Sequence, residues 1–368
     1  RPAWPFLHLA GQLQVLLIDT SAPTPRRRLL AAGAAALALP GCAAWAPASA
    51  GLVKPPRLRE GDTIGLFSSG TRLTEDWIVK AVAQVQALGF RVKLAANVRA
   101  VDGHYSGTVE QRVAALHTLW ADGDVRALWS IRGGAGTANL LPLLDYTAMR
   151  RDPKPVLGYS DATALLLALQ QHAGLVGFHT LAAVSTFTPY SVDLLRAVLM
   201  RPTPTLRQER SADHRARAEL EPQFRARAVR AGNADGPLTG GNLSVLSALV
   251  GTPYGVRSDG ALLFLEDVGE QPYRIDRMLT QLELAGLLSR SAGLLGGVFE
   301  GCEAPPDPQG PRMPFAQVID TRFGAAGVPA VYGYSFGHVR DQMTLPLGIR
   351  ARLDSADESL TLLEPAVD

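Results

Sequence analysis

From about Lys54 onward, short β-rich runs alternate with stretches that carry helical periodicity, and this alternation constrains the fold more than any other feature of the chain. Strands that alternate with helices favour a parallel sheet with helices on both of its faces. The sequence therefore predicts an α/β fold. In the first half we expect strands at 62–68, 90–94, 125–131 and 155–159, and helices at 76–88, 109–120, 137–144 and 161–172.

An arginine-rich segment interrupts the alternation at residues 201–230, where eight arginines stand among four acidic residues. A basic patch for anionic ligands is one interpretation, but a solvated interdomain connection is favoured. A second α/β unit follows it. In this unit we expect strands at 261–266, 294–299 and 330–334, helices at 240–250, 273–285 and 315–323, and short strands within 340–365.

The length of 368 residues suits two domains, and 47% apolar against 19% charged residues excludes a disordered chain. A net charge of +2 gives no global basic field, so nucleic acid is not expected as a partner. Two cysteines make neither a disulfide framework nor a Cys-rich zinc site. We expect four parts: a leader (1–50), a Rossmann-like N-terminal domain with a parallel sheet (54–188), the Arg-rich connection (189–235) and a smaller C-terminal α/β domain (236–368).

The leader carries the features of an export signal. Three arginines at 26–28 precede an uncharged run at 29–39, which is too short to span a bilayer, and small residues follow it. Paired arginines before a weakly apolar run indicate twin-arginine export to the periplasm, with a disordered N-terminus as the alternative. The residues before Cys42 resemble a lipoprotein cleavage box, which predicts membrane anchoring through Cys42. Cys302 would then be left without a disulfide partner.

Ser160 is the first candidate for the chemistry, because it follows an apolar strand and precedes a helix in the sequence Gly-Tyr-Ser-Asp-Ala. A serine in such a strand–turn–helix setting is exposed and aimed away from the sheet, as in a nucleophile elbow. Ala162 stands where the usual elbow has glycine, and a helix-capping serine is the alternative interpretation. A second Gly-Tyr-Ser ends at Ser335 and serves as an internal control, because no helix is expected after it.

A serine nucleophile needs a base, which is usually histidine, and a carboxylate that orients the histidine. His338 lies just beyond an expected strand, and His179 follows an apolar run, so the residues alone leave both open as the base. Glu266 ends the expected strand at 261–266 and is the candidate carboxylate. Its neighbours Asp267 and Glu270 are alternatives, and all three acids would also suit the start of the helix that follows.

A glycine-rich turn at 132–136 follows the expected strand at 125–131. Three glycines within four positions let backbone N–H groups approach a ligand closely, so the turn can bind a phosphate or an oxyanion. The turn lacks the residues of a P-loop, and a nearby serine makes an oxyanion hole the more coherent interpretation. One donor would come from this turn and the other from the amide of Asp161. Gly240 and Gly241 form another glycine-rich turn, which we interpret as packing or helix entry.

Five segments in this order resemble the LD-carboxypeptidases, the serine peptidase family that includes muramoyltetrapeptide carboxypeptidases and microcin-immunity peptidases. The resemblance covers roughly residues 54–362. Each segment is weak alone, but the five in sequence are specific. They are Arg132–Gly136 with 140–142, then 154–163 (KPVLGYSDAT), 237–254 (PLTGGNLSVLSALVGTPY), 265–279 (LEDVGEQPYRIDRML), and 336–338 with 345–348.

The resemblance implies a catalytic triad of Ser160, Glu266 and His338, with the serine on the first domain and the other two on the second. The active site is therefore expected between the two domains. It favours Glu266 over Glu270, and His338 over His179. It also implies oxyanion donors at the backbone amides of Gly134 and Asp161. Arg132 is a candidate for binding a substrate carboxylate, and Gly133 and His179 are further candidate substrate-binding residues. The family commonly has tyrosine or another larger residue where Ala135 stands, so no substrate contact is assigned there.

The activity implied by the resemblance is hydrolysis of the amide between an L-diamino acid and the terminal D-alanine of a murein tetrapeptide. No metal or organic cofactor is implied, and family members often dimerise, so a homodimer is expected. Many members are cytoplasmic, so the leader departs from the family and leaves the compartment open. Two other functions remain: a related serine hydrolase of peptidyl-nucleotide or other acyl conjugates, and a non-catalytic binding protein for cell-wall peptides.

Overall fold

The computed structural model describes residues 51–303, 313–356 and 359–368. The leader, with its paired arginines and Cys42, lies outside these residues. A search of the described ranges finds no helix that is long and apolar enough to cross a membrane.

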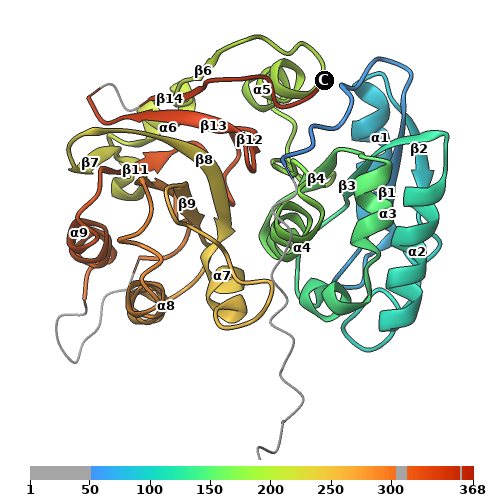
Figure 1. The fold of residues 1–368 in the computed structure, drawn as a ribbon, viewed down its shortest axis with the longest axis horizontal. Helices are drawn as coiled ribbons and strands as arrows, with labels where there is room; N and C mark the ends of the chain where they lie inside the picture. Colours follow the sequence, from blue (N-terminus) through green and yellow to red (C-terminus); the bar gives the residue numbers. More distant parts are fainter. Residues whose placement is uncertain (1–50, 304–312, 357–358) are drawn as a thin grey trace, which may run out of the picture. The chain divides into compact units, whose positions relative to one another are not determined.

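The first half of the described chain builds a six-stranded sheet with the order β12-β5-β4-β3-β1-β2 (Figure 1). The strands β1 to β5 are parallel to their neighbours, and β12, which comes from near the end of the chain, pairs antiparallel with β5. Their bounds are β1 (Thr63–Phe67), β2 (Arg91–Leu94), β3 (Val125–Ser130), β4 (Val156–Gly158), β5 (Phe178–His179) and β12 (Leu345–Pro346).

The helices of this half begin where the sequence supplies capping side chains. The hydroxyl of Thr74 accepts a hydrogen bond from the amide of Trp77, and Thr108 and Gln111 form a reciprocal capping box. The helices are α1 (Glu75–Ala87), α2 (Val109–Ala121), α3 (Tyr146–Arg151), α4 (Thr163–Ala168) and α5 (Pro189–Leu199), with the 3₁₀ helices η1 (Thr137–Leu143) and η2 (Ser160–Ala162) and the π-helical turn η3 (Leu169–Ala173).

The second half builds an eight-stranded sheet with the order β6-β14-β13-β8-β9-β10-β11-β7. The central strands β8 to β11 are parallel, and antiparallel strands complete both edges. The strands are β6 (Leu206–Gln208), β7 (Arg227–Arg230), β8 (Asn233–Asn242), β9 (Leu262–Glu266), β10 (Gly293–Gly297), β11 (Ala330–Tyr334), β13 (Arg350–Asp354) and β14 (Ser359–Leu362). The helices are α6 (Ala212–Arg217), η4 (Pro222–Phe224), α7 (Leu243–Leu249), α8 (Pro272–Leu284) and α9 (Phe315–Ala325).

The mixed α/β fold with parallel-sheet cores is confirmed, but the arginine-rich segment is more than a solvated connection. It supplies β6 and β7, the two edge strands of the second sheet. Gln208 and Phe224 are fully buried. Two of its arginines are engaged: Arg210 donates to two backbone carbonyls, and Arg217 pairs with Glu221 at 2.7 Å. Arg210 and Arg217 are therefore not available for an anionic ligand.

The structure also corrects the start of the helix expected at 240–250. Gly240 and Gly241 belong to strand β8, and α7 begins only at Leu243. Both glycines have positive φ, of 139° and 143°. A Cβ at Gly240 would lie 2.0 Å from the carbonyl oxygen of Phe264, and one at Gly241 would lie 2.5 Å from Thr163. The glycines are therefore packing positions, where β8 approaches β9 and α4 closely.

The two sheets are joined by direct contacts within the described chain. Helix α4, which follows β4, packs against α7 and β8 of the second half. The amide of Asn242 donates to Oγ1 of Thr163 at 3.1 Å, and Oγ1 of Thr239 donates to Oε1 of Gln170 at 2.9 Å. Strand β12 adds a chain segment that crosses from one half to the other. These contacts place the end of β4 beside the end of β9.

Candidate active site

Ser160 lies in a strained turn between β4 and α4. Its φ of 62° is the only positive φ of a non-glycine residue in the described ranges. An L-residue in the left-handed region costs about 1–2 kcal/mol, so surrounding contacts must hold the turn. Behind it, a Cβ at Gly158 would lie 3.0 Å from the Cβ atoms of Ala162 and Ser130. The expected strand–turn–helix setting is present, with a small alanine where the usual elbow has glycine.

The glycine-rich turn after β3 lies directly against this serine. A Cβ at Gly133 would lie 2.6 Å from Cβ and 2.7 Å from Oγ of Ser160, so no side chain fits there. Gly134 has a φ of 112°, and a Cβ on it would clash with Thr71. The turn thus presents bare backbone to Ser160. The amide of Asp161, in the first turn of a helix, has no acceptor within that helix.

Two side chains hold the glycine-rich turn from opposite sides. On one side, the hydroxyl of Thr71 accepts a hydrogen bond from the amide of Ala135 at 3.0 Å. On the other side, the carboxylate of Asp161 accepts from the amide of Thr137 at 3.0 Å and from its hydroxyl at 2.6 Å. The side chain of Asp161 therefore ties the residue after Ser160 to the turn. Sequence reasoning considered only the amide of Asp161 and missed both clamps.

Glu266 and His338 form a hydrogen-bonded pair in the second half of the chain. Glu266 is the last residue of β9 and fully buried, and His338 follows β11, with 19% of its side chain exposed. Nδ1 of His338 lies 2.8 Å from Oε2 of Glu266. A carboxylate accepts, so Nδ1 carries the proton and Nε2 is the basic nitrogen in the neutral ring. This is the arrangement that a general base and its orienting carboxylate require.

The electrostatics of the pair favour its charged form. Burial lowers the pKa of His338, but the charge of Glu266 and the hydrogen bond to it outweigh burial, and the net pKa lies above the ordinary value of 6.5. Burial likewise raises the pKa of Glu266, while His338 lowers it, and the net pKa lies below 4.5. Glu266 therefore stays ionised at neutral pH and can stabilise an imidazolium ion on His338.

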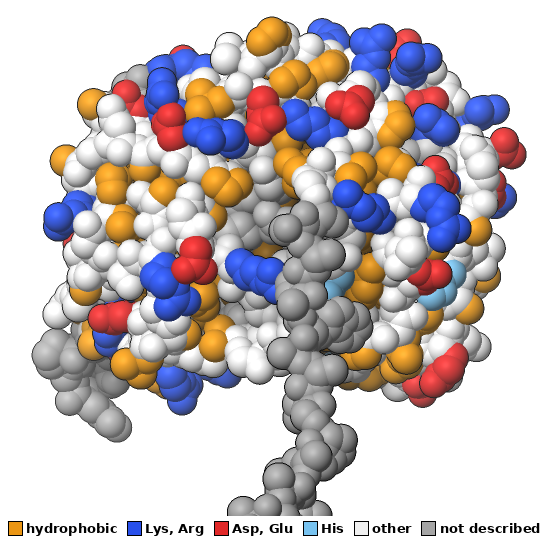
Figure 2. Space-filling view, viewed as in Figure 1, with side chains coloured by type: hydrophobic (Ala, Val, Ile, Leu, Met, Phe, Trp, Pro, Cys, Tyr) orange, Lys and Arg blue, Asp and Glu red, His pale blue; other side chains and the backbone are white. Residues whose placement is uncertain are grey.

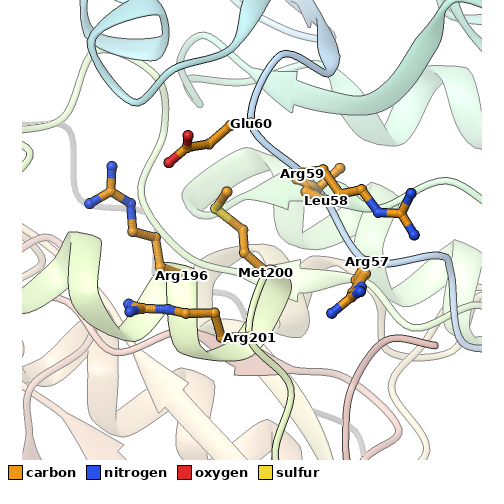
Figure 3. Close-up of a pocket in the computed structure, with 7 residues that line it drawn as sticks. All are labelled: Arg57, Leu58, Arg59, Glu60, Arg196, Met200 and Arg201. Carbon is orange, nitrogen blue, oxygen red and sulfur yellow. The ribbon is translucent and has the colours of Figure 1, made fainter.

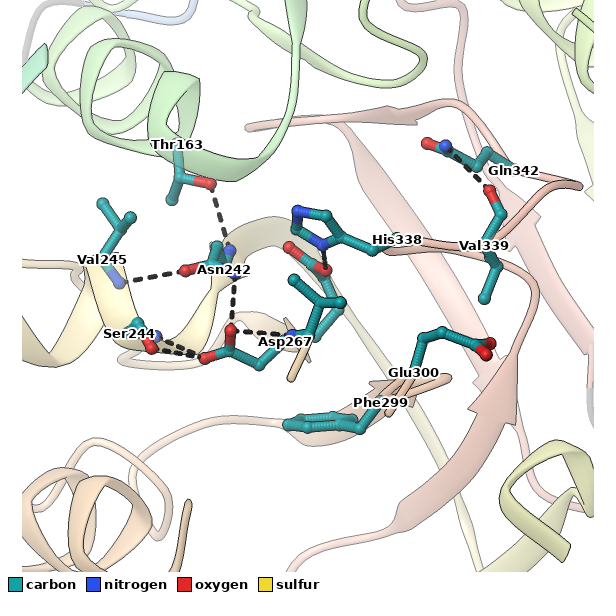
Figure 4. A network of polar contacts seen from close by, with 12 residues as sticks. Thr163, Asn242, Ser244, Val245, Asp267, Phe299, Glu300, His338, Val339 and Gln342 are labelled. Atoms are coloured by element: carbon teal, nitrogen blue, oxygen red, sulfur yellow. Dashed lines mark hydrogen bonds and ion pairs between the residues drawn. The ribbon is translucent and has the colours of Figure 1, made fainter. Parts of the chain in front are cut away.

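The alternative acids have other partners. Oδ2 of Asp267 accepts from the amide of Ser244 at 2.9 Å and from its hydroxyl at 2.7 Å, at the start of α7. Asn242 donates from Nδ2 to Oδ1 of Asp267 at 3.1 Å (Figure 4). Glu270 pairs with Arg274 at 3.1 Å. Only Glu266 of the three reaches His338.

Asn242 is a residue of the site that sequence reasoning missed. Its backbone and side chain contact Thr163, Asp267 and the amide of Val245 (Figure 4). It therefore connects the helix that follows Ser160 to the acidic residues at the end of β9. The only sequence signal was its position directly after Gly240 and Gly241.

Tyr159 links Ser160 to the Glu266–His338 pair. The ring of Tyr159, directly before Ser160, contacts the ring of His338 with centroids 4.8 Å apart. Among the described residues, Ser160 Oγ makes no hydrogen bond to His338. Such hydrogen bonds are often long in a free enzyme and tighten when substrate binds. The fold brings all three predicted residues to the same junction of the two sheets.

The control serine and the competing histidine lie in different surroundings. Ser335 is fully buried, its hydroxyl accepts from the amide of Ser211 at 2.9 Å, and no helix follows it. His179 is also fully buried, on β5. Burial lowers its pKa to about 4, and its ring contacts Phe264 and Tyr159. His179 therefore has no access to a substrate proton.

Arg132 is the first residue of the glycine-rich turn at 132–136. Its guanidinium stacks on the ring of Trp77, 4.3 Å from the ring centroid. The described residues contain no ion pair between Arg132 and a carboxylate. Stacking holds the planar guanidinium in one orientation and leaves its N–H groups available for an anion.

Two cavities of the described chain lie outside this set of residues. Neither contains a serine or any candidate catalytic residue, so neither offers a nucleophile with a base. The face drawn in Figure 2 shows Lys and Arg interspersed with Asp and Glu. One cavity, of about 400 Å³, is lined by His117, Trp120, Ala121, Asp145, Ala148, Met149, Arg151 and Asp152. The other, of about 350 Å³, is lined by Arg57, Leu58, Arg59, Glu60, Arg196, Met200 and Arg201 (Figure 3).

A strained serine at a strand–helix turn and a buried Glu–His pair on an α/β fold are typical of hydrolases. The chain belongs to the LD-carboxypeptidase family. Residues 64–180 match the LD-carboxypeptidase N-terminal domain, and residues 235–353 match the LD-carboxypeptidase C-terminal domain. The resemblance found in the sequence is thus confirmed, and the chain is a peptidase of the carboxypeptidase class.

Relatives of two kinds share this fold. The probable murein peptide carboxypeptidase of Bacillus subtilis is 33% identical over 84% of this chain and 94% of its own length. The microcin C7 self-immunity protein MccF of Escherichia coli is 26% identical over 83% of this chain and 94% of its own length. The crystal structure of muramoyltetrapeptide carboxypeptidase from Oxalobacter formigenes superposes with a TM-score of 0.69, with 26% identity over 82% of this chain and 97% of that one.

Proposed function

We propose that this protein is a serine LD-carboxypeptidase that removes the terminal D-alanine from murein tetrapeptides. The observation that carries the proposal is the Glu266–His338 hydrogen bond, which lies at the same junction as the strained Ser160. The relatives named murein carboxypeptidases support the substrate class. The bond cleaved would join the L-centre of the diamino acid to D-alanine.

In the first half-reaction, Nε2 of His338 takes the proton from Oγ of Ser160, and Oγ attacks the carbonyl carbon of the scissile amide. The orientation of the ring supports this step, because the hydrogen bond from Nδ1 to Glu266 leaves Nε2 as the basic atom. The carboxylate of Glu266 stabilises the imidazolium ion that results and is not itself protonated.

The negative charge on the carbonyl oxygen would be stabilised by the amides of Gly134 and Asp161. Both amides adjoin Ser160, because the turn at Gly133 packs against its side chain and Asp161 follows it in the chain. Removal of one such donor typically reduces kcat by about 10²–10³-fold. The clamps by Thr71 and by the Asp161 side chain keep the donors in place before substrate binds.

The leaving group and the acyl group are then released in turn. His338 gives its proton to the nitrogen of the departing D-alanine as the C–N bond breaks, and Ser160 keeps the acyl group as an ester. A water molecule, deprotonated by His338, then attacks the ester carbonyl. Ser160 regains its proton, and the shortened tripeptide leaves with a new carboxylate.

We assign recognition of the carboxylate of the terminal D-alanine to Arg132. A carboxypeptidase must distinguish a free chain end from an internal peptide bond, and a guanidinium group binds a carboxylate through two parallel hydrogen bonds. The ring of Trp77 stacks on the guanidinium of Arg132 and holds it in one orientation. The position of Arg132, one residue before the Gly133–Gly134 turn, puts this recognition next to the scissile bond.

Incubation with a free muramyl tetrapeptide, followed by mass analysis, tests the proposal. The expected product has lost one alanine, and chiral analysis shows the D-enantiomer. Two further substrates sharpen the result: a tetrapeptide with an amidated C-terminus, which Arg132 should reject, and a peptidyl-adenylate. Turnover of the peptidyl-adenylate with no release of D-alanine would replace the proposed substrate by an acyl-nucleotide conjugate.

A further inference from the structure

His179 is a buried histidine whose ring contacts Tyr159, the residue before the candidate nucleophile, and Phe264, on the strand that ends at Glu266. On β5 it is in register with Gly158 of β4, two residues before Ser160. Its ring contacts Phe264 of β9 with centroids 5.2 Å apart, and it contacts Tyr159 and Phe336 at 6.0 and 6.2 Å. Phe264 and Glu266 are two residues apart on one strand, so their side chains point to the same face. The ring of His179 thus lies on the face that carries Glu266.

The burial of His179 leaves its polar atoms without partners. Neither Nδ1 nor Nε2 has a hydrogen-bond partner among the described residues, and the side chain is 1% exposed. Oε1 of Glu266, the carboxylate oxygen that does not face His338, is buried and without a partner in the same ranges. Buried polar groups without partners destabilise a fold, so each of these groups calls for an interaction that the protein side chains alone do not supply.

The two groups are complementary in chemistry and in charge. Burial lowers the pKa of His179 to about 4, while Glu266 acts in the opposite direction, so the ring is neutral at neutral pH. A neutral imidazole has one N–H donor, and a carboxylate oxygen is an acceptor. The charged groups that face this region are Glu266 and His338, with Asp267 and Arg132 acting on His338.

Because the ring of His179 contacts Phe264, two residues before Glu266 on β9, we propose that His179 is a positioning residue that donates a hydrogen bond to Oε1 of Glu266 through one buried water. The bond fixes the rotamer of Glu266, and through Oε2 it fixes the ring of His338. Each carboxylate oxygen of Glu266 then has a histidine partner, one from each half of the chain. This inference rests on the proposed function, because it assigns His179 to the same reaction.

A matched pair of variants separates a hydrogen-bonding role from space filling. His179→Gln keeps an N–H donor, and His179→Met has a similar volume without one. The readout is the rate at which a fluorophosphonate probe labels Ser160, which does not require the natural substrate. We expect the Met variant to label about tenfold more slowly than the Gln variant, the ratio that corresponds to about 1.4 kcal/mol.

A second readout follows His338 itself by proton NMR. The hydrogen-bonded Nδ1 proton of His338 should give a downfield resonance in the wild type and in His179→Gln, and a broadened or missing one in His179→Met. The control is His214, another fully buried histidine whose ring nitrogens have no partner in the described ranges and whose ring contacts Phe224. His214→Gln and His214→Met should label at equal rates and keep the resonance.

The outcomes distinguish this inference from the proposed function. Wild-type protein that is labelled at Ser160, together with equal rates and an unchanged resonance in the two His179 variants, would overturn the role of His179 alone. Wild-type protein that is not labelled at Ser160 would overturn the serine mechanism and this inference with it.

Discussion

Nδ1 of His338 lies 2.8 Å from Oε2 of Glu266, although the two residues are 72 positions apart in the sequence. Glu266 ends β9 and His338 follows β11, and β10 lies between these strands in the sheet. The parallel order brings both strand ends to one edge, where side chains from separate strands converge. A site at such an edge can combine residues that no local sequence motif contains.

The pair predicts the effect of removing the negative charge at Glu266. Glu266→Gln keeps the shape but no longer stabilises the imidazolium ion, so kcat should fall by about 10²–10⁴-fold with a small change in KM. Steady-state kinetics with a tetrapeptide measure this. Glu270→Gln is the control, because Glu270 pairs with Arg274 near the surface, and its kcat should not change. Equal losses in the two variants would remove Glu266 from the mechanism.

The pH dependence of kcat/KM should follow His338. The base must be neutral to accept the serine proton, and Glu266 holds the pKa of His338 above 6.5, so activity should be lost as pH falls through a midpoint above 6.5. In Glu266→Gln the carboxylate is gone, burial dominates, and the midpoint should move to lower pH. A profile measured from acid to neutral pH tests the sign. An unchanged midpoint in Glu266→Gln would show that another group limits the acid side.

The strained turn predicts that at position 160 glycine gives a more stable protein than alanine, the reverse of the usual order. Glycine usually destabilises relative to alanine by about 0.5–1 kcal/mol, but a φ of 62° favours glycine. We expect Ser160→Gly to be more stable than Ser160→Ala by about 1 kcal/mol in denaturant unfolding, with both variants inactive. At Ser335, whose φ is not positive, Ser335→Gly should be the less stable of the corresponding pair. The same order at both positions would contradict a strained nucleophile turn.

The clamp on the glycine-rich turn predicts a loss of rate without a loss of affinity. Thr71→Val removes the acceptor for the amide of Ala135, so the oxyanion donors lose their fixed position and kcat should fall about tenfold. Thr108→Val is the matched control. It removes the N-cap of α2 and should lower stability by about 1 kcal/mol while kcat is unchanged. A rise in KM alone in Thr71→Val would argue that the turn binds substrate instead.

Most of the fold could be predicted from the sequence, because the spacing of hydrophobic residues and the capping residues determine helices and strands through neighbours in the sequence. The helix expected at 109–120 is α2, capped by Thr108, and the strand expected at 261–266 is β9. The misses involve long-range pairing. Residues 206–208 and 227–230 join a sheet whose other strands lie elsewhere in the chain, so their arginine-rich composition resembled a connection.

The site shows the same division between local and long-range signals. The elbow at Ser160 and the turn at Gly133 could be predicted because each follows an apolar strand. The choice of His338 over His179 depended on the family resemblance, since both follow apolar runs. The clamp from Thr71 had no local signal, because it acts on a segment distant in sequence. Asn242 had only its position after two glycines, because its partner Thr163 also lies far away in the sequence.

The most direct test of the account is to map the site of modification by a serine-directed fluorophosphonate. Wild-type protein, Ser160→Ala and Ser335→Ala are treated alike, digested and analysed by mass spectrometry. The account predicts one modified peptide, which contains Ser160, in the wild type and in Ser335→Ala, and none in Ser160→Ala. Modification of Ser335, or equal modification of the Ser160→Ala protein, would contradict the assignment of Ser160 as the nucleophile.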